Sequence, residues 1–326
     1  MSLDDPVVIT CSISGAIANR DQCPAIPYTP QEYAAEARRI VDEGGTMIHI
    51  HARKPDGTPS YEVEDFAAIT EAIRGEVGDA AIVNFSTGTI GVSLQKRIEY
   101  LRACRPEVAA LNMGSMNYAK YSRSRKGFVF SMVFQNPFEE IVQLLEAMNE
   151  LGIKPEHECF DIGHVGSLAP LIDMGVLTPP LHVDCVMGVL GGIPPTAQNL
   201  AAMVANIPST ASGEGASSHW GVIGISREQW MLVGAALSLG GSIRVGLEDN
   251  LYLPDGRMAR SNGELIAKAR GMVEDVGRRP AAVEEARRLL NVAPRPAQQV
   301  SGQVAPQVAG EAAGQVAPQV AREAAR

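Results

Sequence analysis

Short runs of β-branched and other apolar residues alternate with longer amphipathic runs along most of this chain, and this alternation limits the possible folds more than any other feature. The first pair is typical: residues 7–14 have the pattern of a strand, and residues 30–43 that of a helix that begins after Thr29 and ends at Gly44. The same criteria predict eight strand–helix pairs. The predicted strands are residues 7–14, 46–51, 81–85, 108–112, 158–161, 182–187, 220–224 and 242–247, and the predicted helices are residues 30–43, 63–74, 93–103, 137–151, 166–173, 197–205, 227–239 and 262–276.

Eight alternations between residues 7 and 276 favour one particular α/β architecture. They predict a closed (β/α)₈ barrel, the TIM barrel, over an open doubly wound sheet, because eight pairs follow one another without a long break. No glycine-rich dinucleotide fingerprint follows the first strand, which lowers the open-sheet alternative further. We therefore predict a single TIM-barrel catalytic domain over residues 1–294, with a C-terminal helix at residues 280–290.

The end of the chain has a different composition. Residues 302–313 recur at residues 314–325 with one change, and the segment consists mainly of Ala, Gln, Val and Pro. Such a segment has no aromatic and few large apolar groups with which to bury surface. We predict that residues 295–326 form a low-complexity, disordered tail, with a small interaction element as the alternative.

Composition and the chain start limit the partners. The chain has 28 Lys and Arg against 37 Asp and Glu, a formal net charge of −9, and none of the predicted elements carries a basic stripe interleaved with aromatic residues. Nucleic acid is therefore not an expected partner, and a small molecule is. The first residues lack the pattern of a secretory signal, and no apolar segment approaches the roughly 20 residues that span a bilayer. We expect a cytoplasmic protein without a membrane partner.

Two histidines lie one residue apart in the second predicted strand. Because side chains alternate between the faces of a strand, His49 and His51 project to the same side, while Ile48 and Ile50 project to the other. The pair ends the strand and is followed by Arg53 and a turn. This arrangement indicates a metal site; the alternative is a pair of buried, hydrogen-bonded core histidines.

A catalytic zinc commonly has three protein ligands and one open position, so a third ligand is needed. Barrels carry their chemistry at the carboxyl ends of their strands. In a closed barrel the eighth strand lies one strand away from the second, and Glu248 and Asp249 follow it. Either carboxylate could reach the histidines, and spacing alone does not choose between them. Roles in a solvated loop or a helix cap are the alternative.

Six motifs in order along residues 6–290 resemble the β-keto acid cleavage enzymes, typified by the 3-keto-5-aminohexanoate cleavage enzyme. They are CPAIPYT after the first strand, HIHAR at the second, NFSTGT at the third, PEHECFD at the fifth, LHVDCVMGVLGG at the sixth and IRVGLEDNLY at the eighth. The resemblance implies a zinc-dependent TIM-barrel enzyme, usually a homotetramer. Its substrates would be a β-keto acid and acetyl-CoA, and its products acetoacetate and the CoA thioester of the remaining acyl fragment.

The resemblance also assigns residues. His49, His51 and Glu248 match the zinc ligands of the family. A second group, credited with deprotonating the substrate, is matched by Asp249, Arg244 and Ser86.

Further positions are expected to contact the substrate. Ser115 stands where the typical enzyme has a threonine near the substrate, and Glu158 matches an acidic residue of the pocket. Thr87 and Gly88 follow Ser86 at the end of the third strand and are further candidates. The glycine-rich loops at residues 188–192 and 213–215 could admit the phosphates of CoA, although a plain turn is the simpler interpretation of either.

One departure from the family concerns the substrate. The typical enzyme has a glutamate after the first strand that holds the amino group of its substrate, and this chain has Ile17 there. Isoleucine cannot neutralise an ammonium group, and burying an unpaired charge is costly. We therefore predict a β-keto acid other than 3-keto-5-aminohexanoate, with an apolar or neutral distal end; Glu158 leaves a cationic end as an alternative.

Two other functions are compatible with parts of the sequence. A metal-dependent hydrolase on the same fold also has His-x-His at a strand end, but it needs further histidines, and His182 and His219 lie near strand starts, at the opposite end of the barrel. A non-catalytic barrel that binds partners through its tail would not need Arg244 and Asp249 beside the metal ligands.

Overall fold

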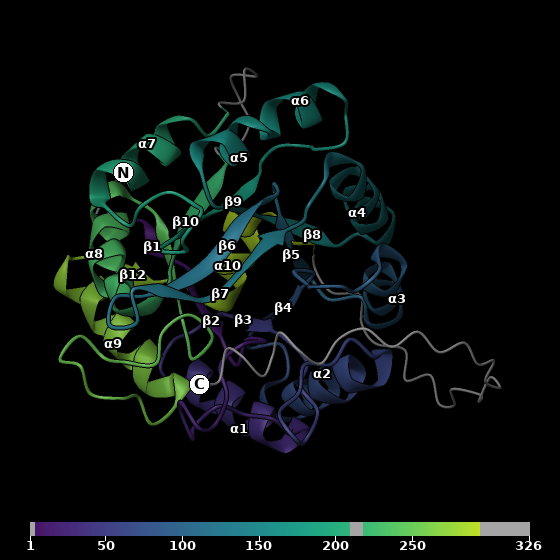
Figure 1. Cartoon of the computed structure of the whole chain (residues 1–326). Coiled ribbons are helices and arrows are strands. Elements are labelled where there is room, and N and C mark those ends of the chain that lie inside the picture. Colours follow the sequence, from purple (N-terminus) through teal and green to yellow (C-terminus); the bar gives the residue numbers. More distant parts are fainter. Residues whose placement is uncertain (1–3, 209–217, 294–326) are drawn as a thin grey trace.

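The computed structural model describes residues 4–208 and 218–293 (Figure 1). Within these ranges, eight parallel strands close into a barrel in the order β10-β11-β2-β3-β4-β5-β8-β9. The predicted TIM barrel is therefore confirmed. The barrel strands are β2 (Ile9–Ser12), β3 (Met47–Ile50), β4 (Ile82–Ser86), β5 (Val108–Asn112), β8 (Lys154–Cys159), β9 (His182–Met187), β10 (His219–Gly224) and β11 (Ser242–Val245).

Helices surround the barrel (Figure 1). The first begins as predicted, because the Thr29 side chain accepts a hydrogen bond from the Glu32 amide and the Glu32 carboxylate accepts one from the Thr29 amide. The surrounding helices are α1 (Pro30–Asp42), α2 (Val63–Val77), α3 (Leu94–Cys104), α4 (Phe138–Leu151), α5 (Ile162–Gly166), α6 (Leu168–Asp173), α7 (Ala197–Ala205), the short 3₁₀ helix η1 (Ser226–Glu228), α8 (Gln229–Leu239) and α9 (Asn262–Asp275).

The fifth barrel strand differs from its prediction. It covers Lys154–Cys159 and not residues 158–161, and it pairs with β5 from Lys154 opposite Val108 to Glu158 opposite Asn112. Polar and charged residues interrupt the apolar pattern that marks the other strands. Glu156 is nevertheless fully buried, because the side chains that surround it inside the barrel are polar and not apolar.

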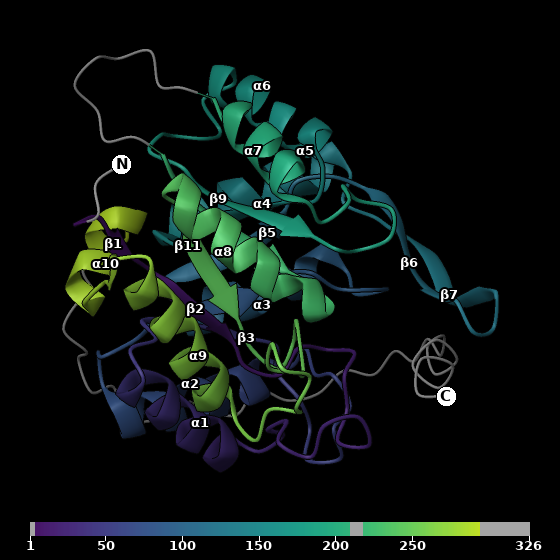
Figure 2. The same ribbon diagram turned by 90° about the vertical axis from the view of Figure 1, so that its left-hand side faces the viewer.

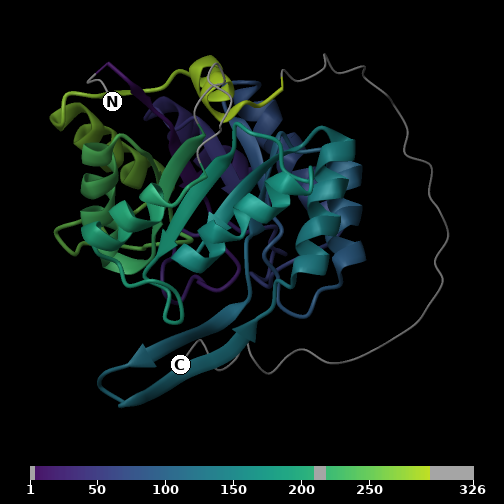
Figure 3. The same cartoon turned by 90° about the horizontal axis from the view of Figure 1, so that it is seen from above.

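A hairpin between β5 and α4 was not predicted. Strands β6 (Met116–Ser122) and β7 (Gly127–Phe134) pair antiparallel. The hairpin projects from the end of the barrel toward which the barrel strands point (Figures 2 and 3). Backbone pairing of Ala119 with Leu190 attaches it to the loop after β9.

The opposite end of the barrel is closed by the C-terminal helix α10 (Val283–Leu290). Leu290 and Ala286 pack with the first residues of three barrel strands, Met47, Ile82 and Val108. A short parallel pair, β1 (Pro6–Val7) with β12 (Arg279–Pro280), leads into this helix. The predicted tail, residues 295–326, lies outside the described residues. None of the helices in residues 4–208 and 218–293 has the length and hydropathy that crossing a bilayer requires.

A buried histidine of β8 predicts a pH dependence of stability. Burial lowers the pKa of His157 to about 3, and its ring donates from Nδ1 to the His182 carbonyl over 2.7 Å. In the unfolded chain an imidazole titrates near about 6.5, so below that pH the unfolded state binds the extra proton. The stability that the neutral ring contributes is present above pH 6.5 and is lost as the pH falls.

The His157→Gln variant isolates this contribution, because glutamine can donate to the same carbonyl and does not titrate. Between about pH 6.5 and 4.5 the unfolding free energy of the wild type should fall relative to that of the variant, by up to ~1.4 kcal/mol per pH unit. Urea denaturation of both proteins at several pH values measures the difference. A constant difference would contradict the prediction.

Candidate active site

A pocket opens at the carboxyl end of the barrel strands. Its volume is about 830 Å³, including the open mouth. Eight of the residues singled out from the sequence line it: Ile17, His49, His51, Ser86, Gly88, Glu158, Glu248 and Asp249. The pocket therefore collects side chains that are up to 232 positions apart in the chain, counted from Ile17 to Asp249 (249 − 17).

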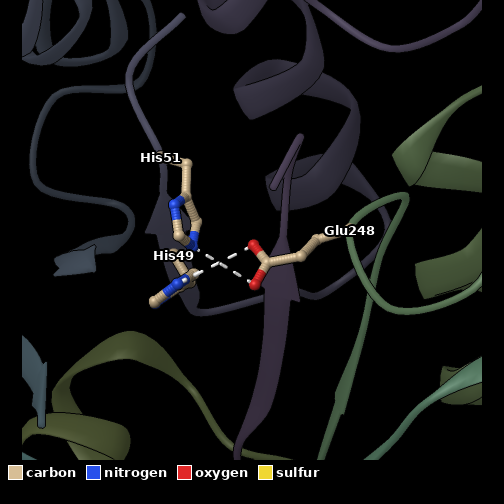
Figure 4. Close-up of side chains that lie close together, drawn as sticks. All are labelled: His49, His51 and Glu248. Carbon is tan, nitrogen blue, oxygen red and sulfur yellow. Dashed lines mark ion pairs between the residues drawn. The ribbon is translucent and has the colours of Figure 1, made fainter. Parts of the chain in front are cut away.

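His49, His51 and Glu248 face one another in this pocket (Figure 4). The Nε2 atom of His49 lies 3.7 Å from Glu248 Oε2, and the Nε2 atom of His51 lies 3.4 Å from Glu248 Oε1. One ligand atom from each residue lies within 4.8 Å of the others. Gly15 leaves room for the glutamate, because a Cβ on it would stand 2.7 Å from Glu248 Cγ.

The chemistry of these three side chains fits a metal ion. Glu248 Oε2 is buried without a hydrogen-bond partner among the described residues, as a vacant ligand atom would be. Burial lowers the pKa of His49 well below its usual value, which keeps the ring in the neutral form that binds metals. Burial alone would raise the pKa of Glu248, but His51, Arg244 and His49 together hold it far below its usual value, so the carboxylate is ionised.

Arg244 links three acidic residues of the pocket. Its Nε and Nη2 atoms donate to the two carboxylate oxygens of Asp249 over 3.0 and 3.1 Å. Nη2 also donates to Glu248 over 2.7 Å, and Nη1 donates to Glu158 over 3.0 Å. The side chain is only 3% exposed, so these charge-assisted bonds hold the three carboxylates in a fixed arrangement.

Asp249 has a second partner that we did not predict. Ser12, at the end of β2, donates from Oγ to Asp249 Oδ2 over 2.5 Å. The sequence-based assignment placed Ser86 in the same group, as a residue that orients either Asp249 or the substrate. The Ser86 hydroxyl accepts from the Gly88 amide over 3.2 Å, and the residue lines the pocket. Burial, with a contribution from Glu248, raises the pKa of Asp249 to about 6, although Arg244 and Ser12 act to lower it.

Two predicted substrate contacts lie away from the pocket wall. Thr87 is buried and donates to the Ala110 carbonyl over 2.5 Å, which is a structural role in the barrel. Ser115 is exposed, and its hydroxyl accepts from the Asn136 amide over 2.7 Å at the base of the hairpin. Asn112, at the end of β5, also lines the pocket, although we did not predict it to be a site residue.

A second polar cluster lies inside the barrel. Glu156, His182 and Asp184 are buried, and His182 Nε2 is 3.2 Å from Asp184 Oδ2. Asn84 donates to Glu156 over 2.5 Å, and Glu156 Oε2 lies 4.0 Å from His49 Nδ1, so the cluster lies next to His49 but beyond hydrogen-bonding distance of it. His182 is the first residue of β9, as predicted, and does not line the mouth pocket; its side chain is buried in the barrel interior.

The closed barrel and the mouth pocket, with two imidazoles, an ionised glutamate and a buried aspartate, define a TIM-barrel enzyme of the kind that acts on small molecules at a metal-binding site. The family model described as beta-keto acid cleavage enzyme matches residues 6–292. The chain belongs to this family.

Characterised relatives cover nearly the whole barrel. The chain is 32% identical over 289 residues to a 3-keto-5-aminohexanoate cleavage enzyme of Acetoanaerobium sticklandii, covering 89% of this chain and 99% of the relative. It is 34% identical over 307 residues to a 3,5-dioxohexanoate:acetyl-CoA acetone transferase of Paraburkholderia graminis, covering 90% and 97%. A solved structure, the apo structure of ObcA, shares the fold with a TM-score of 0.68 at 21% identity, over 82% of this chain and 66% of that one.

Proposed function

We propose that this protein is a zinc-dependent enzyme that converts a β-keto acid and acetyl-CoA into acetoacetate and the CoA thioester of the remaining acyl fragment. One observation carries the proposal: the His49, His51 and Glu248 triad opens into the same pocket as Asp249, whose carboxylate Arg244 and Ser12 hold in place.

Two imidazole nitrogens and one carboxylate are a common ligand set of catalytic zinc, which keeps a further position open. When bound, the ion would supply Lewis-acid stabilisation of the negative charge that develops on the substrate oxygens. His49, His51 and Glu248 would hold it.

Asp249 is the proposed base. It would take a proton from the carbon between the carboxylate and the ketone of the substrate, and a pKa of about 6 is close to the pH at which such a base works well. That carbon would then attack the thioester carbonyl of acetyl-CoA and release the CoA thiolate. The thiolate would attack the original ketone, the old carbon–carbon bond would break, and Asp249 would return the proton to the acetoacetate carbon.

Arg244 and Ser12 would keep the Asp249 carboxylate pointed at the reacting carbon throughout. Neither needs to exchange a proton with the substrate. The Asp249 carboxylate accepts two hydrogen bonds from Arg244 and one from Ser12. These three bonds leave the Asp249 side chain little freedom to rotate.

The pocket wall supports a substrate with an apolar or neutral distal end. Ile17 lines the pocket together with Ile90, Met132, Phe134 and Ile225. The acid that remains near them, Glu158, is paired with Arg244. Among the relatives, the transferase from Paraburkholderia graminis is named for 3,5-dioxohexanoate, whose distal end is uncharged.

We expect kcat/KM for β-keto acids with an uncharged distal end to exceed that for 3-keto-5-aminohexanoate, on the order of tenfold, because each carboxylate among the described residues that line the pocket is already paired with Arg244. Steady-state kinetics with both substrates at saturating acetyl-CoA measures the ratio. The Ile17→Glu variant should shift the ratio toward the amino compound, and Ile17→Leu is the matched control. A wild-type preference for the amino compound would overturn this assignment.

Acetoacetate formation that requires both acetyl-CoA and a β-keto acid, measured on a broad panel, tests the proposed function. A metal-dependent hydrolase would bind metal and form no acetoacetate with any member of the panel. The homotetramer and the cytoplasmic location remain proposals from the family resemblance, and measuring the molecular mass in solution tests the first.

A further inference from the structure

The base of the β6–β7 hairpin forms part of the pocket wall. Tyr118 of β6 and Met132 and Phe134 of β7 line the pocket. From there the two strands run outward past the barrel mouth (Figure 2). The hairpin thus connects the reacting end of the pocket with a tip that stands in solvent.

The tip of this hairpin, residues 120–128, is strongly basic. It contains Lys120, Arg123, Arg125 and Lys126, all exposed, in a chain whose net charge is −9. Residues 108–138 contain no acidic residue. None of the ion pairs between described residues involves Lys120, Arg123 or Lys126. Positive charges this close together on a short hairpin repel one another, and binding of an anion relieves that repulsion.

Two aromatic side chains accompany these charges. Tyr121 is 48% exposed and Phe128 63% exposed, and their rings form an edge-to-face pair with centroids 5.9 Å apart. Exposed aromatic rings beside basic residues are typical of surfaces on which a nucleobase stacks while its phosphates are neutralised. The tip is too short a basic segment to indicate a nucleic-acid partner. Because the hairpin joins the tip to the pocket, a small-molecule anion that also enters the pocket is the better match.

The length of the hairpin matches one particular ligand. Arg123, at the tip, lies five positions after Tyr118, at the pocket, which corresponds to roughly 17 Å of extended strand. The pantetheine arm of CoA, between the thioester sulfur and the diphosphate, is of comparable extended length. A thioester placed in the pocket would therefore bring its diphosphate and 3′-phosphate to the basic tip.

The glycine-rich loop at residues 188–192 has a structural role beside the hairpin. A Cβ on Gly191, whose φ is +116°, would stand 1.8 Å from the Asn117 carbonyl oxygen. The glycine is needed so that the loop can pack against β6, which fixes the direction of the hairpin. The second glycine-rich loop, at residues 213–215, lies outside the described residues.

We propose that the tip of the β6–β7 hairpin binds the nucleotide part of CoA: Lys120, Arg123 and Lys126 contact its phosphates, and its adenine stacks on Tyr121, whose ring forms the edge-to-face pair with Phe128. This inference rests on the proposed function, since it concerns the second substrate of that reaction. It makes the hairpin the element that selects acetyl-CoA over shorter thioesters.

Calorimetric titration of the full chain with CoA, dephospho-CoA and pantetheine tests the proposal without turnover. The wild type should bind CoA most tightly. In the Arg123→Ser/Lys126→Ser variant the Kd for CoA should rise on the order of tenfold, while the Kd for pantetheine stays at the wild-type value. The control pair, Arg102→Ser/Arg288→Ser, removes two exposed charges from α3 and α10 and should leave the Kd for CoA unchanged.

Two results would overturn the inference: wild-type affinity for CoA no higher than for pantetheine, or an unchanged Kd for CoA in the hairpin variant. Failure of the proposed function has a different signature. In that case CoA binding would depend on the hairpin charges, and no acetoacetate would form with any β-keto acid. The Tyr121→Ala variant adds a second readout, because loss of stacking should weaken binding of CoA and dephospho-CoA equally and leave pantetheine unaffected.

Discussion

The Asp249→Asn variant should lose acetoacetate formation by roughly 10²- to 10⁴-fold, the range expected when a general base is removed. Asparagine has nearly the same shape, and its amide oxygen can still accept from Arg244 Nε and Ser12, although its nitrogen cannot accept from Arg244 Nη2. It cannot take a proton from the substrate. Glu248 and both histidines are untouched, so the protein should still bind zinc in a ratio close to that of the wild type.

This prediction is checked by kcat with a β-keto acid and acetyl-CoA, together with the metal content of the purified variant. Asp173→Asn, an exposed aspartate of α6, is the matched control and should retain wild-type turnover. If Asp249→Asn kept turnover within tenfold of the wild type, another group would have to be the base. Loss of metal together with turnover would show that Asp249 supports the metal site itself.

The Glu248→Gln variant should lose metal. Removing a charged ligand leaves only two imidazoles, and we expect metal affinity to fall by more than the roughly 10- to 100-fold that follows loss of a supporting partner of a ligand. Turnover should fall with it. Competition with a chelator gives the metal Kd, and atomic spectroscopy after dialysis gives the metal content.

Glu158→Gln is the matched control for this experiment. Like Glu248, Glu158 is a glutamate paired with Arg244, but it is not part of the triad. It should therefore retain metal. Equal metal loss in the two variants would mean that the charge around Arg244, and not ligation by Glu248, holds the ion.

The barrel was predictable because its strands and helices carry strong local signals. Strand β9 and helix α7 have the predicted boundaries, and α1 begins at the predicted cap. Strand β8 was predicted in the wrong place because Glu156 is buried in a polar cluster, which depends on contacts with other strands. The hairpin was missed because a charged tip interrupts its alternating pattern, and an exposed hairpin needs little apolar surface.

The site was predictable to a similar extent. Alternation in β3 and barrel closure indicated that His49 and His51 would meet a carboxylate of the loop after β11. Sequence spacing could not reveal which serine contacts Asp249, because Ser12 and Ser86 both end barrel strands. Nor could sequence spacing show that the Thr87 side chain is buried in the barrel wall, where it donates to the Ala110 carbonyl.

The fate of the acetyl carbons tests the central claim most directly. When acetyl-CoA carrying ¹³C in both acetyl carbons is incubated with the enzyme and an unlabelled β-keto acid, the account predicts acetoacetate labelled at C3 and C4 only, with an unlabelled acyl group on the new CoA thioester. Label appearing in free acetate, with none in acetoacetate, would contradict it and would instead indicate a hydrolase.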